Sequence, residues 1–524
     1  MSEGRFAMIR SVGTVGGMTL TSRVTGLIRD IAFAQFLGSG PIADAFFVAF
    51  RIPNFFRRIF GEGALSAAFV PVYSEYESRY PEREVKAFLS LMAGRLGLIL
   101  ILFTFFGVLF APQLIHLIAP GFAAEPLKFD AAVTTLRLAF PYLFFISLVA
   151  LAAGILNTHS RFAVAAVTPV LLNLCLIATV WLWVPTSENP AMALGGGVLL
   201  AGFIQFGFQL PFLRRLGRLP RPTLRARSSE EGLAEAGVSQ VFRLMLPAIF
   251  GVSIAQINLL VNTILASFLV TGSVSWLYYS DRLMEFPLGV FGVALATVIL
   301  PSLSRNVAEG NDTKYGMTLD WALRLVFLIC VPATIGLVTL AVPLIATLFQ
   351  YGAFSADDVE MASRSLVAFA IGLPAFVLIK VLAPGFYARK DTRTPVVIGA
   401  IAMAVNVVVA LLLVWSMAHT GLALATSISG AVNATLLYIY LRQRTGFRLA
   451  SGWISFISRV GIAGGVMALV LYGAVPEFAV WTSANGAWRV SQLAVWIVAG
   501  GASYFAALYL MGVRAHQLIE RPVS

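Results

Sequence analysis

Long stretches of apolar residues, separated by short polar loops, run through the whole chain. A membrane-spanning helix needs ~20 consecutive, predominantly apolar residues, and the hydropathy pattern predicts fourteen such helices. Their expected limits are 8–37, 42–74, 87–118, 131–156, 161–184, 191–215, 238–269, 273–304, 317–349, 358–388, 395–417, 421–441, 453–474 and 488–513. Several of these segments are longer than a bilayer requires, so we expect some of them to tilt or kink.

The composition agrees with this pattern. Of the 524 residues, 59% are hydrophobic and 12% are charged, and the mean hydropathy is +0.85. Soluble domains are about half apolar and about a quarter charged, so most of this surface must face lipid. A cytosolic enzyme, a nucleic-acid-binding protein and a secreted scaffold are thereby excluded. We expect an all-α polytopic membrane protein. No spacing among Cys175, Cys330 and the four histidines is typical of a metal site, so no metal or cofactor is expected.

The basic residues in the loops predict how the chain is oriented. By alternating sides from span to span, 22 lysines and arginines fall on the side of the N-terminus, and only Lys128 and Arg489 fall on the other. Lys and Arg are concentrated in cytoplasmic loops of membrane proteins. Both termini are therefore expected in the cytoplasm.

The chain also contains an internal repeat. Residues 36–40 align with residues 268–272 at an offset of 232, Pro141 matches Pro374, and Asn173 matches Asn406. Chance similarity between apolar helices is the alternative explanation. A period of six helices gives two halves of the same orientation, related by a pseudo-two-fold axis along the membrane normal. The expected domains are an N-lobe at 1–216, a basic amphipathic cytoplasmic linker at 217–237, a C-lobe at 238–448, and a terminal helix pair at 449–524.

Ionisable residues inside the predicted spans are the candidate functional groups. A charged side chain at the centre of a membrane helix costs ~2.5–3.5 kcal/mol, so such residues usually line a hydrated cavity or pair with one another. Arg29, Arg51 and Arg282 each lie eight or nine residues below the outer end of their helix, a common depth of about 12–14 Å. The set comprises Arg23, Arg29, Asp30, Asp44, Arg51, Arg57, Arg58, Glu62, Asp281, Arg282 and Glu285.

These residues predict a cavity that binds an anion. Arginine binds phosphate oxygens through two parallel hydrogen bonds, so a phosphate or pyrophosphate is the expected ligand, and the acids would hold the arginines in place. The alternative is that the arginines join helices through salt bridges or extend to the membrane interface. We find no GxxxxGK[ST] motif and no loop large enough for a nucleotide-binding domain, so ATP-driven pumping is not expected. The membrane potential or an ion gradient would supply the driving force.

The same segments resemble the MurJ (MviN-type) lipid II flippases of the multidrug/oligosaccharidyl-lipid/polysaccharide exporter superfamily. The resemblance lies in SRVTGLIRD (22–30), DAFFVAFRIPNFFRRIFGEGALSAAFVP (44–71), SVSWLYYSDRLMEFPLGVFGVALATVILPSLS (273–304) and KVLAPGFYARKDTRTP (380–395). It implies two six-helix lobes around a central cavity, and a groove for a lipid tail on the last two helices. We expect a monomer in the bacterial cytoplasmic (inner) membrane.

The resemblance further implies a substrate and a set of site residues. The substrate would be lipid II, undecaprenyl-pyrophosphoryl-MurNAc-pentapeptide-GlcNAc, moved from the inner to the outer leaflet for cell-wall synthesis. The functional residues of the family fall on Arg23, Arg29, Arg57, Arg282, Asp30, Asp44 and Glu285, and Arg51 stands at a position that is basic in relatives but can be lysine. We expect the pyrophosphate to bind the five arginines of this set. The acids would support them, together with Arg58, Glu62 and Asp281, which the pattern of charges in the spans adds. The alternatives are a drug or cation exporter, or another polyprenyl-lipid exporter, of the same superfamily. A membrane-bound transferase is less consistent with the short outer loops.

Overall fold

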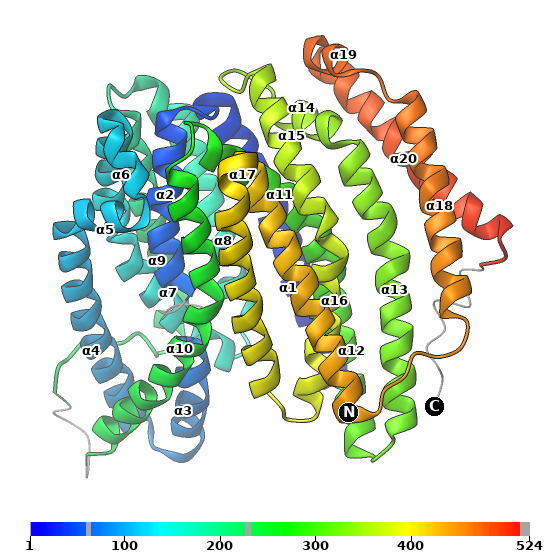
Figure 1. Ribbon diagram of the computed structural model, residues 1–524. Helices are drawn as coiled ribbons and strands as arrows, with labels where there is room; N and C mark the ends of the chain where they lie inside the picture. The colour runs from blue at the N-terminus through cyan, green and yellow to red at the C-terminus, as the bar shows by residue number, and fades with distance from the viewer. Residues whose placement is uncertain (1, 59–63, 226–231, 514–524) are drawn as a thin grey trace. The chain divides into compact units, whose positions relative to one another are not determined.

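The computed structural model describes residues 2–58, 64–225 and 232–513 (Figure 1), and for residues 2–15, 250–255 and 293 it describes the backbone alone. The regular structure of these residues is helical, which confirms the predicted all-α class. Ten helical segments among them are long and apolar enough to cross a membrane. The chain is therefore a multi-pass helical membrane protein.

The chain forms two compact units, Met1–Gly272 and Ser273–Ser524. In the first unit, α9 packs against α6, α7 and α8, while α1 packs on α8 and α2 packs on α6. The elements of this unit are α1 (Ser2–Leu37), α2 (Pro41–Phe56), α3 (Ser66–Arg79), α4 (Glu82–Leu109), α5 (Ala111–Ile118), η2 (Pro120–Ala124), α6 (Pro126–Ala139), α7 (Tyr142–Thr158), α8 (Phe162–Ala178), η3 (Thr179–Trp183), η4 (Val184–Thr186), α9 (Pro190–Arg215) and α10 (Leu233–Ser267).

In the second unit, α16 packs against α12, α13 and α17, and α15 packs on α11 and α17. The elements of this unit are α11 (Ser273–Pro287), η5 (Leu288–Gly292), α12 (Val293–Ala308), α13 (Asp312–Thr339), α14 (Ala341–Phe349), α15 (Ala356–Ile371), α16 (Leu373–Ala388), α17 (Arg393–Thr445), α18 (Trp453–Ala474), α19 (Phe478–Ser483) and α20 (Gly486–Leu510).

Helix α10 belongs to the first compact unit. The repeat assigns residues 238–269 to the C-lobe, whereas in the structure α10 packs on α3 and α4. Gly237 near its start packs closely on α3, since a Cβ there would lie 2.5 Å from the end of the Tyr76 side chain, which would have to move. The division of the chain into repeat lobes stays a prediction.

Several predicted spans are interrupted in the structure, mostly where proline removes a backbone donor. The span 131–156 separates into α6 and α7 at Pro141, and the span 358–388 separates into α15 and α16 just before Pro374. The element α17 contains the two predicted helices 395–417 and 421–441, which meet at a kink between them, as the hydropathy pattern predicts. Ala418 has φ 49° and ψ −134° within it, so the backbone leaves the helical region there.

The order and packing of the elements recur along the chain. Helices α11, α13, α14 and α15 begin 230–232 residues after α2, α4, α5 and α6, respectively. The packing recurs as well, since α2 packs on α6 and α3 on α7, while α11 packs on α15 and α12 on α16. This correspondence supports the internal repeat that the sequence indicates.

The last two long helices, α18 and α20, lie side by side (Figure 1, orange to red). Small residues allow the close approach that membrane helices use in place of a hydrophobic driving force. A Cβ on Gly500 of α20 would lie 3.1–3.3 Å from the side chains of Leu471 and Met467 on α18.

Arg489 fastens the start of α20 to the end of α14. This arginine is only 5% exposed. Its guanidinium donates hydrogen bonds to the carbonyl oxygens of Ala346 and Gln350, each at 3.1 Å, and to that of Thr482 at 2.9 Å. The last carbonyls of a helix have no partner within the helix and carry partial negative charge, so a cation stabilises them.

A short extended segment, residues 218–225, crosses α4 after the end of α9, and we call it the strap. Arg218 donates to Glu77 at 2.5 Å, and the amide of Thr223 donates to the carbonyl oxygen of Ser90 at 3.1 Å. Burial opposes ionisation of Glu77, but hydrogen bonds from Arg218 and Tyr73 outweigh it and hold the pKa of this carboxyl below its usual value. The anchor is therefore present at neutral pH and is lost only as the pH falls through that lowered pKa.

Gly94→Ala should detach the strap from α4. A Cβ at Gly94 would lie 2.1 Å from the carbonyl oxygen of Thr223, so the strap backbone must move away. A lost hydrogen bond contributes about 1 kcal/mol, so hydrogen exchange in residues 219–225 should accelerate about fivefold or more. Gly97→Ala is the control, because a Cβ at Gly97 has no heavy atom within 4 Å. Equal exchange in the two variants would contradict this description of the strap.

Candidate functional site

Arg29 and Asp30 form a buried ion pair where α1 meets α8. Arg29 is 8% exposed, and its Nη2 and Nε lie 2.7 and 3.0 Å from Oδ1 of Asp30. Its Nη1 donates to Oδ1 of Asn173 at 3.0 Å. The amide of Asn173 in turn donates to the carbonyl oxygen of Ser22 and to the hydroxyl of Thr25. Asn173 on α8 thus connects the Arg29 side chain to the preceding turns of α1, the helix that carries Arg29.

Arg23 lies nearly two turns before Arg29 on α1. Its side chain is half-buried and makes no hydrogen bond or ion pair with a residue that the structure describes. Arg23 therefore remains available to a ligand within its own unit, whereas the Arg29 guanidinium already has acceptors for Nε, Nη1 and Nη2.

Asn173→Leu should destabilise the first unit. The substitution leaves one buried N–H of Arg29 without its acceptor, which costs about 1–3 kcal/mol. We expect a lower thermal unfolding temperature of the purified protein in detergent. Leu174→Ala is the matched control, since Leu174 is exposed on the same helix and surface substitutions change stability by only about 0.5 kcal/mol. Equal unfolding temperatures would show that the hydrogen bond to Asn173 contributes little.

Arg51 and Arg58 both contact α10. Nη1 of Arg51 donates to the hydroxyl of Thr263, and Nη1 of Arg58 donates to Oε1 of Gln256 at 3.3 Å. The two arginines are seven residues apart, as are their two partners. The sequence places Arg51 and Arg58 on one helix face by this spacing, and their shared contact with α10 confirms it.

Arg57 lies at the break between α2 and α3. Helix α2 ends at Phe56, three residues after Pro53, and residues 57–58 are π-helical. Nε of Arg57 donates to Oδ1 of Asn54 at 2.8 Å. Glu62, predicted to support these arginines, lies outside the described residues.

Asp44 lies in a second buried ionic cluster. Its Oδ2 is 3.8 Å from Nζ of Lys128, and both side chains are 1% exposed. The same oxygen accepts a hydrogen bond of 2.8 Å from the amide of Gly272. Glu125 completes the cluster: Oε1 is 3.0 Å from Lys128, and Oε2 accepts from the hydroxyl of Thr271. The cluster therefore secures the segment that follows α10.

Arg282 lies on α11 in the second unit and is more accessible than Arg29. Its Nη1 is 2.8 Å from Oε2 of Glu285, one turn along the helix, and the two side chains are 33% and 44% exposed. The guanidinium carbon also lies 5.0 Å from the centre of the Tyr278 ring. Asp281, the neighbouring acid, is half-buried.

Each of these arginines presents a guanidinium group, which can bind an anion through two parallel hydrogen bonds. The guanidinium groups of Arg29 and Arg282 are each held by a carboxylate that a phosphate could replace or reinforce. Among the described residues, no group of three or more His, Cys, Asp or Glu could hold a metal ion. The arginines make these contacts within their own units. That they converge on one substrate stays a prediction.

Sequence reasoning missed the role of three polar residues. Lys128 and Arg489 are the two basic residues that the loop count places on the outer side, yet both are buried. Their position near the end of a predicted span gave no sign of this. Asn173 appeared only as a position of the repeat. Its partner Arg29 lies 144 residues away, and nothing in the local pattern signals such a contact.

The chain matches the family model described as lipid II flippase MurJ over residues 33–490. It is 44% identical to the "Probable lipid II flippase MurJ" of Vibrio cholerae, over 98% of this chain and 97% of that protein. It is 39% identical to the "Lipid II flippase MurJ" of Burkholderia cenocepacia, over 97% of this chain and 98% of that protein.

Solved structures give the same result. The fold is similar to that of "Lipid II flippase MurJ, inward closed conformation", with a TM-score of 0.79, 25% identity and coverage of 97% of this chain and 99% of that one. An inward-facing MATE multidrug resistance transporter is similar with a TM-score of 0.66, 17% identity and coverage of 81% and 94%. That second likeness shows a shared fold alone. With the match over residues 33–490 and the identity over nearly the whole length, the chain belongs to the MurJ family of lipid II flippases, which are transporters rather than enzymes.

Proposed function

We propose that this chain moves lipid II, the undecaprenyl-pyrophosphate-linked peptidoglycan precursor, from the inner to the outer leaflet of the bacterial cytoplasmic membrane. The observation that carries the proposal is the set of arginines on α1, α2 and α11 in a member of this flippase family. Charged side chains at such depth are costly unless water or an anion compensates them. A head group with two phosphates provides that anion.

The architecture that we propose for this activity has fourteen membrane spans. Two six-helix lobes are related by a pseudo-two-fold axis along the membrane normal, and α18 and α20 are added after them. The recurrence of elements at 230–232 residues supports this arrangement. The break at Ala418 supports it as well. With 53 residues at ~1.5 Å per residue, an unbroken α17 would be far longer than one membrane span requires, so the break divides it into two spans.

We propose that both termini lie in the cytoplasm, and that the protein acts as a monomer. The excess of arginine and lysine in the loops on the side of the N-terminus supports this orientation. The burial of Lys128 and Arg489 strengthens the asymmetry, because the two basic residues counted on the outer side do not face solvent there.

The roles that we propose for the site residues follow from their partners. Arg29, Arg57 and Arg282 bind the pyrophosphate in an inward-open cavity, with Arg23 and Arg51 assisting. Asp30 and Glu285 hold Arg29 and Arg282 in orientation while no substrate is bound. Rocking of the lobes then exposes the head group on the outer side, while the prenyl tail stays in lipid along α18 and α20.

The proposed driving force is the membrane potential or an ion gradient. A head group with two negative charges that leaves an inside-negative cell gains ~4.6 kcal/mol per 100 mV. A cavity of basic residues that releases its ligand outward can use this field without a nucleotide.

The decisive experiment measures the leaflet in which lipid II is accessible in cells depleted of the protein. Accumulation of lipid II on the cytoplasmic side, reversed by re-expression, is the expected result. An unchanged distribution would leave the chain as a transporter of this fold with a different substrate.

A further inference from the structure

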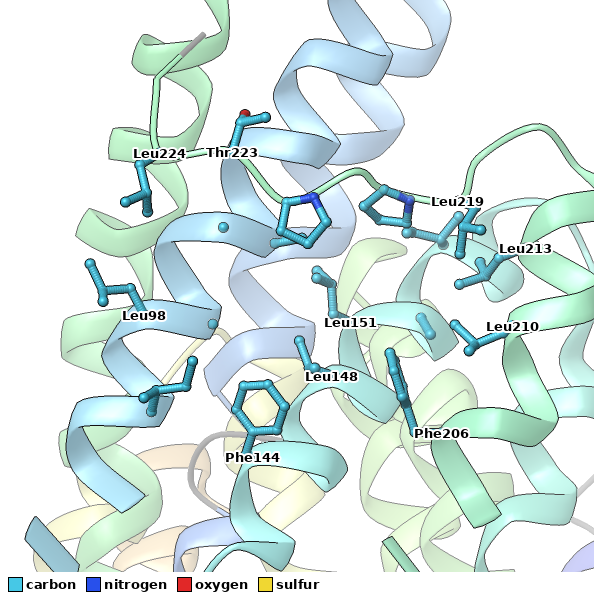
Figure 2. A pocket seen from close by; sticks show the side chains of 18 residues that line it. Leu98, Phe144, Leu148, Leu151, Phe206, Leu210, Leu213, Leu219, Thr223 and Leu224 are labelled. Atoms are coloured by element: carbon cyan, nitrogen blue, oxygen red, sulfur yellow. The ribbon is translucent and has the colours of Figure 1, made fainter. Parts of the chain in front are cut away.

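The first unit contains a cavity that the transport site does not use. It has a volume of 490 Å³ and opens between α4, α7 and α9, beneath the strap. Its lining includes Leu98, Phe144, Leu148 and Leu210 on the three helices and Leu224 on the strap (Figure 2). Of the described residues that line it, Thr223 alone has a polar side chain.

The strap gives the cavity an apolar roof. Pro220 and Pro222 line the cavity from above, and proline has no backbone N–H. Two amide donors that would otherwise need water or an acceptor are thus absent from the roof. At the side, Leu98 and Ile101 are exposed on the outer face of α4, so the cavity borders the hydrocarbon of the membrane.

Three arginines are direct sequence neighbours of residues that line the edge of the cavity at the strap. Arg214 follows the lining residue Leu213, Arg221 lies between the two roof prolines, and Arg225 follows Leu224. All three are exposed, and their guanidinium groups make no ion pair with a residue that the structure describes. Arg218 differs from them, because Glu77 already binds it.

We propose that this cavity binds one acyl chain of an anionic glycerophospholipid, whose phosphate contacts Arg214, Arg221 and Arg225. The apolar lining accepts a hydrocarbon chain that enters from the bilayer between α4 and α7. The arginines favour a phosphate in the adjoining head-group layer, because basic residues beside the membrane attract anionic lipids. The acyl chain of a neutral lipid would also fill the apolar cavity, but its head group would not compensate the positive charges of the three arginines.

The lipid site is separate from transport. Its lining comes from α4, α7, α9 and the strap, and none of the proposed pyrophosphate-binding residues takes part in it. An acyl chain in this cavity would pack directly beneath the strap and hold it against α4. We therefore expect this cavity to bind a membrane lipid in preference to the transported precursor.

The test uses purified full-length protein in vesicles that contain phosphatidylglycerol with a photoactivatable diazirine at the end of one acyl chain. Crosslinks located by mass spectrometry should fall on α4, α7 and the strap. Gly97→Leu places a side chain in the cavity, since Gly97 lines it and a Cβ there has no heavy atom within 4 Å. The yield of crosslinks should be at least about fivefold lower in this variant than in the native protein. Gly207→Leu, at an equally open position on α9 outside the lining, should keep it.

The head group is tested with the same probe built on phosphatidylcholine. The native protein should label several-fold more strongly with phosphatidylglycerol, and the double variant Arg221→Gln, Arg225→Gln should lose this preference. Equal labelling with both lipids, or equal labelling of Gly97→Leu and Gly207→Leu at matched unfolding temperatures, would overturn the proposal. Displacement of the label by lipid II but not by excess phosphatidylglycerol would also overturn it, by assigning the cavity to the precursor.

Discussion

Arg282→Ala is expected to abolish flipping while the amount of protein in the membrane stays unchanged. The Arg282 side chain is 33% exposed. It forms an ion pair with Glu285, which lies one helical turn further along α11 and is 44% exposed. Breaking such an accessible pair changes stability by about 0–1 kcal/mol. The proposed loss of function comes instead from the missing positive charge and forked donor for the pyrophosphate. Complementation of depleted cells and the leaflet distribution of lipid II would both measure it.

The matched control for this substitution is Arg364→Ala on α15. Arg364 also lies in the second unit and pairs with Glu360 at i,i+4, but it is outside the proposed site. This variant should complement fully. If Arg282→Ala instead lowered the amount of protein, Arg282 would serve to join helices, which is the alternative that the sequence leaves open.

Lys128→Met should destabilise the protein by about 3–5 kcal/mol, the cost of removing one partner from a buried ion pair. Asp44 would be left buried at 1% exposure without the cation that now lies beside it. We expect a lower unfolding temperature in detergent and less protein in the membrane. The double variant Asp44→Asn, Lys128→Met should recover part of the loss, because the amide keeps an acceptor for Gly272 without a buried charge.

Lys86→Met is the control for this second prediction. Lys86 pairs with Glu82 on the surface of α4, with side chains 53% and 63% exposed, so its removal should leave the unfolding temperature nearly unchanged. If Lys128→Met kept its stability but stopped transport, Asp44 and Lys128 would act in the transport cycle rather than in fastening the end of α10.

Much of the fold could be predicted from sequence because lipid imposes a simple pattern. Hydropathy located the helices to within a few residues, and the prolines at 141 and 374 mark real interruptions. The repeat predicted which elements correspond. It did not predict that α10 packs on α3 and α4, because packing partners depend on surfaces that periodicity does not describe.

The candidate site was predictable only in part. Ionisable residues within apolar helices are rare, so Arg29, Arg51 and Arg282 stand out from the sequence alone. Their partners do not. Asn173 and Thr263 are ordinary polar residues in apolar segments, and they become informative only once α1 meets α8 and α2 meets α10. The cavity under the strap was missed for a similar reason, since its lining comes from three helices and a loop.

The anchoring of Arg489 bears on how the protein is made. An arginine in the first turn of a membrane helix is costly to insert until its guanidinium group has hydrogen-bond acceptors. Its acceptors, the carbonyls of Ala346, Gln350 and Thr482, all precede it in the chain. They are therefore synthesised before the ribosome delivers α20. Helix α20 can therefore pair its arginine with carbonyl acceptors that are made before it, which lowers the cost of inserting Arg489.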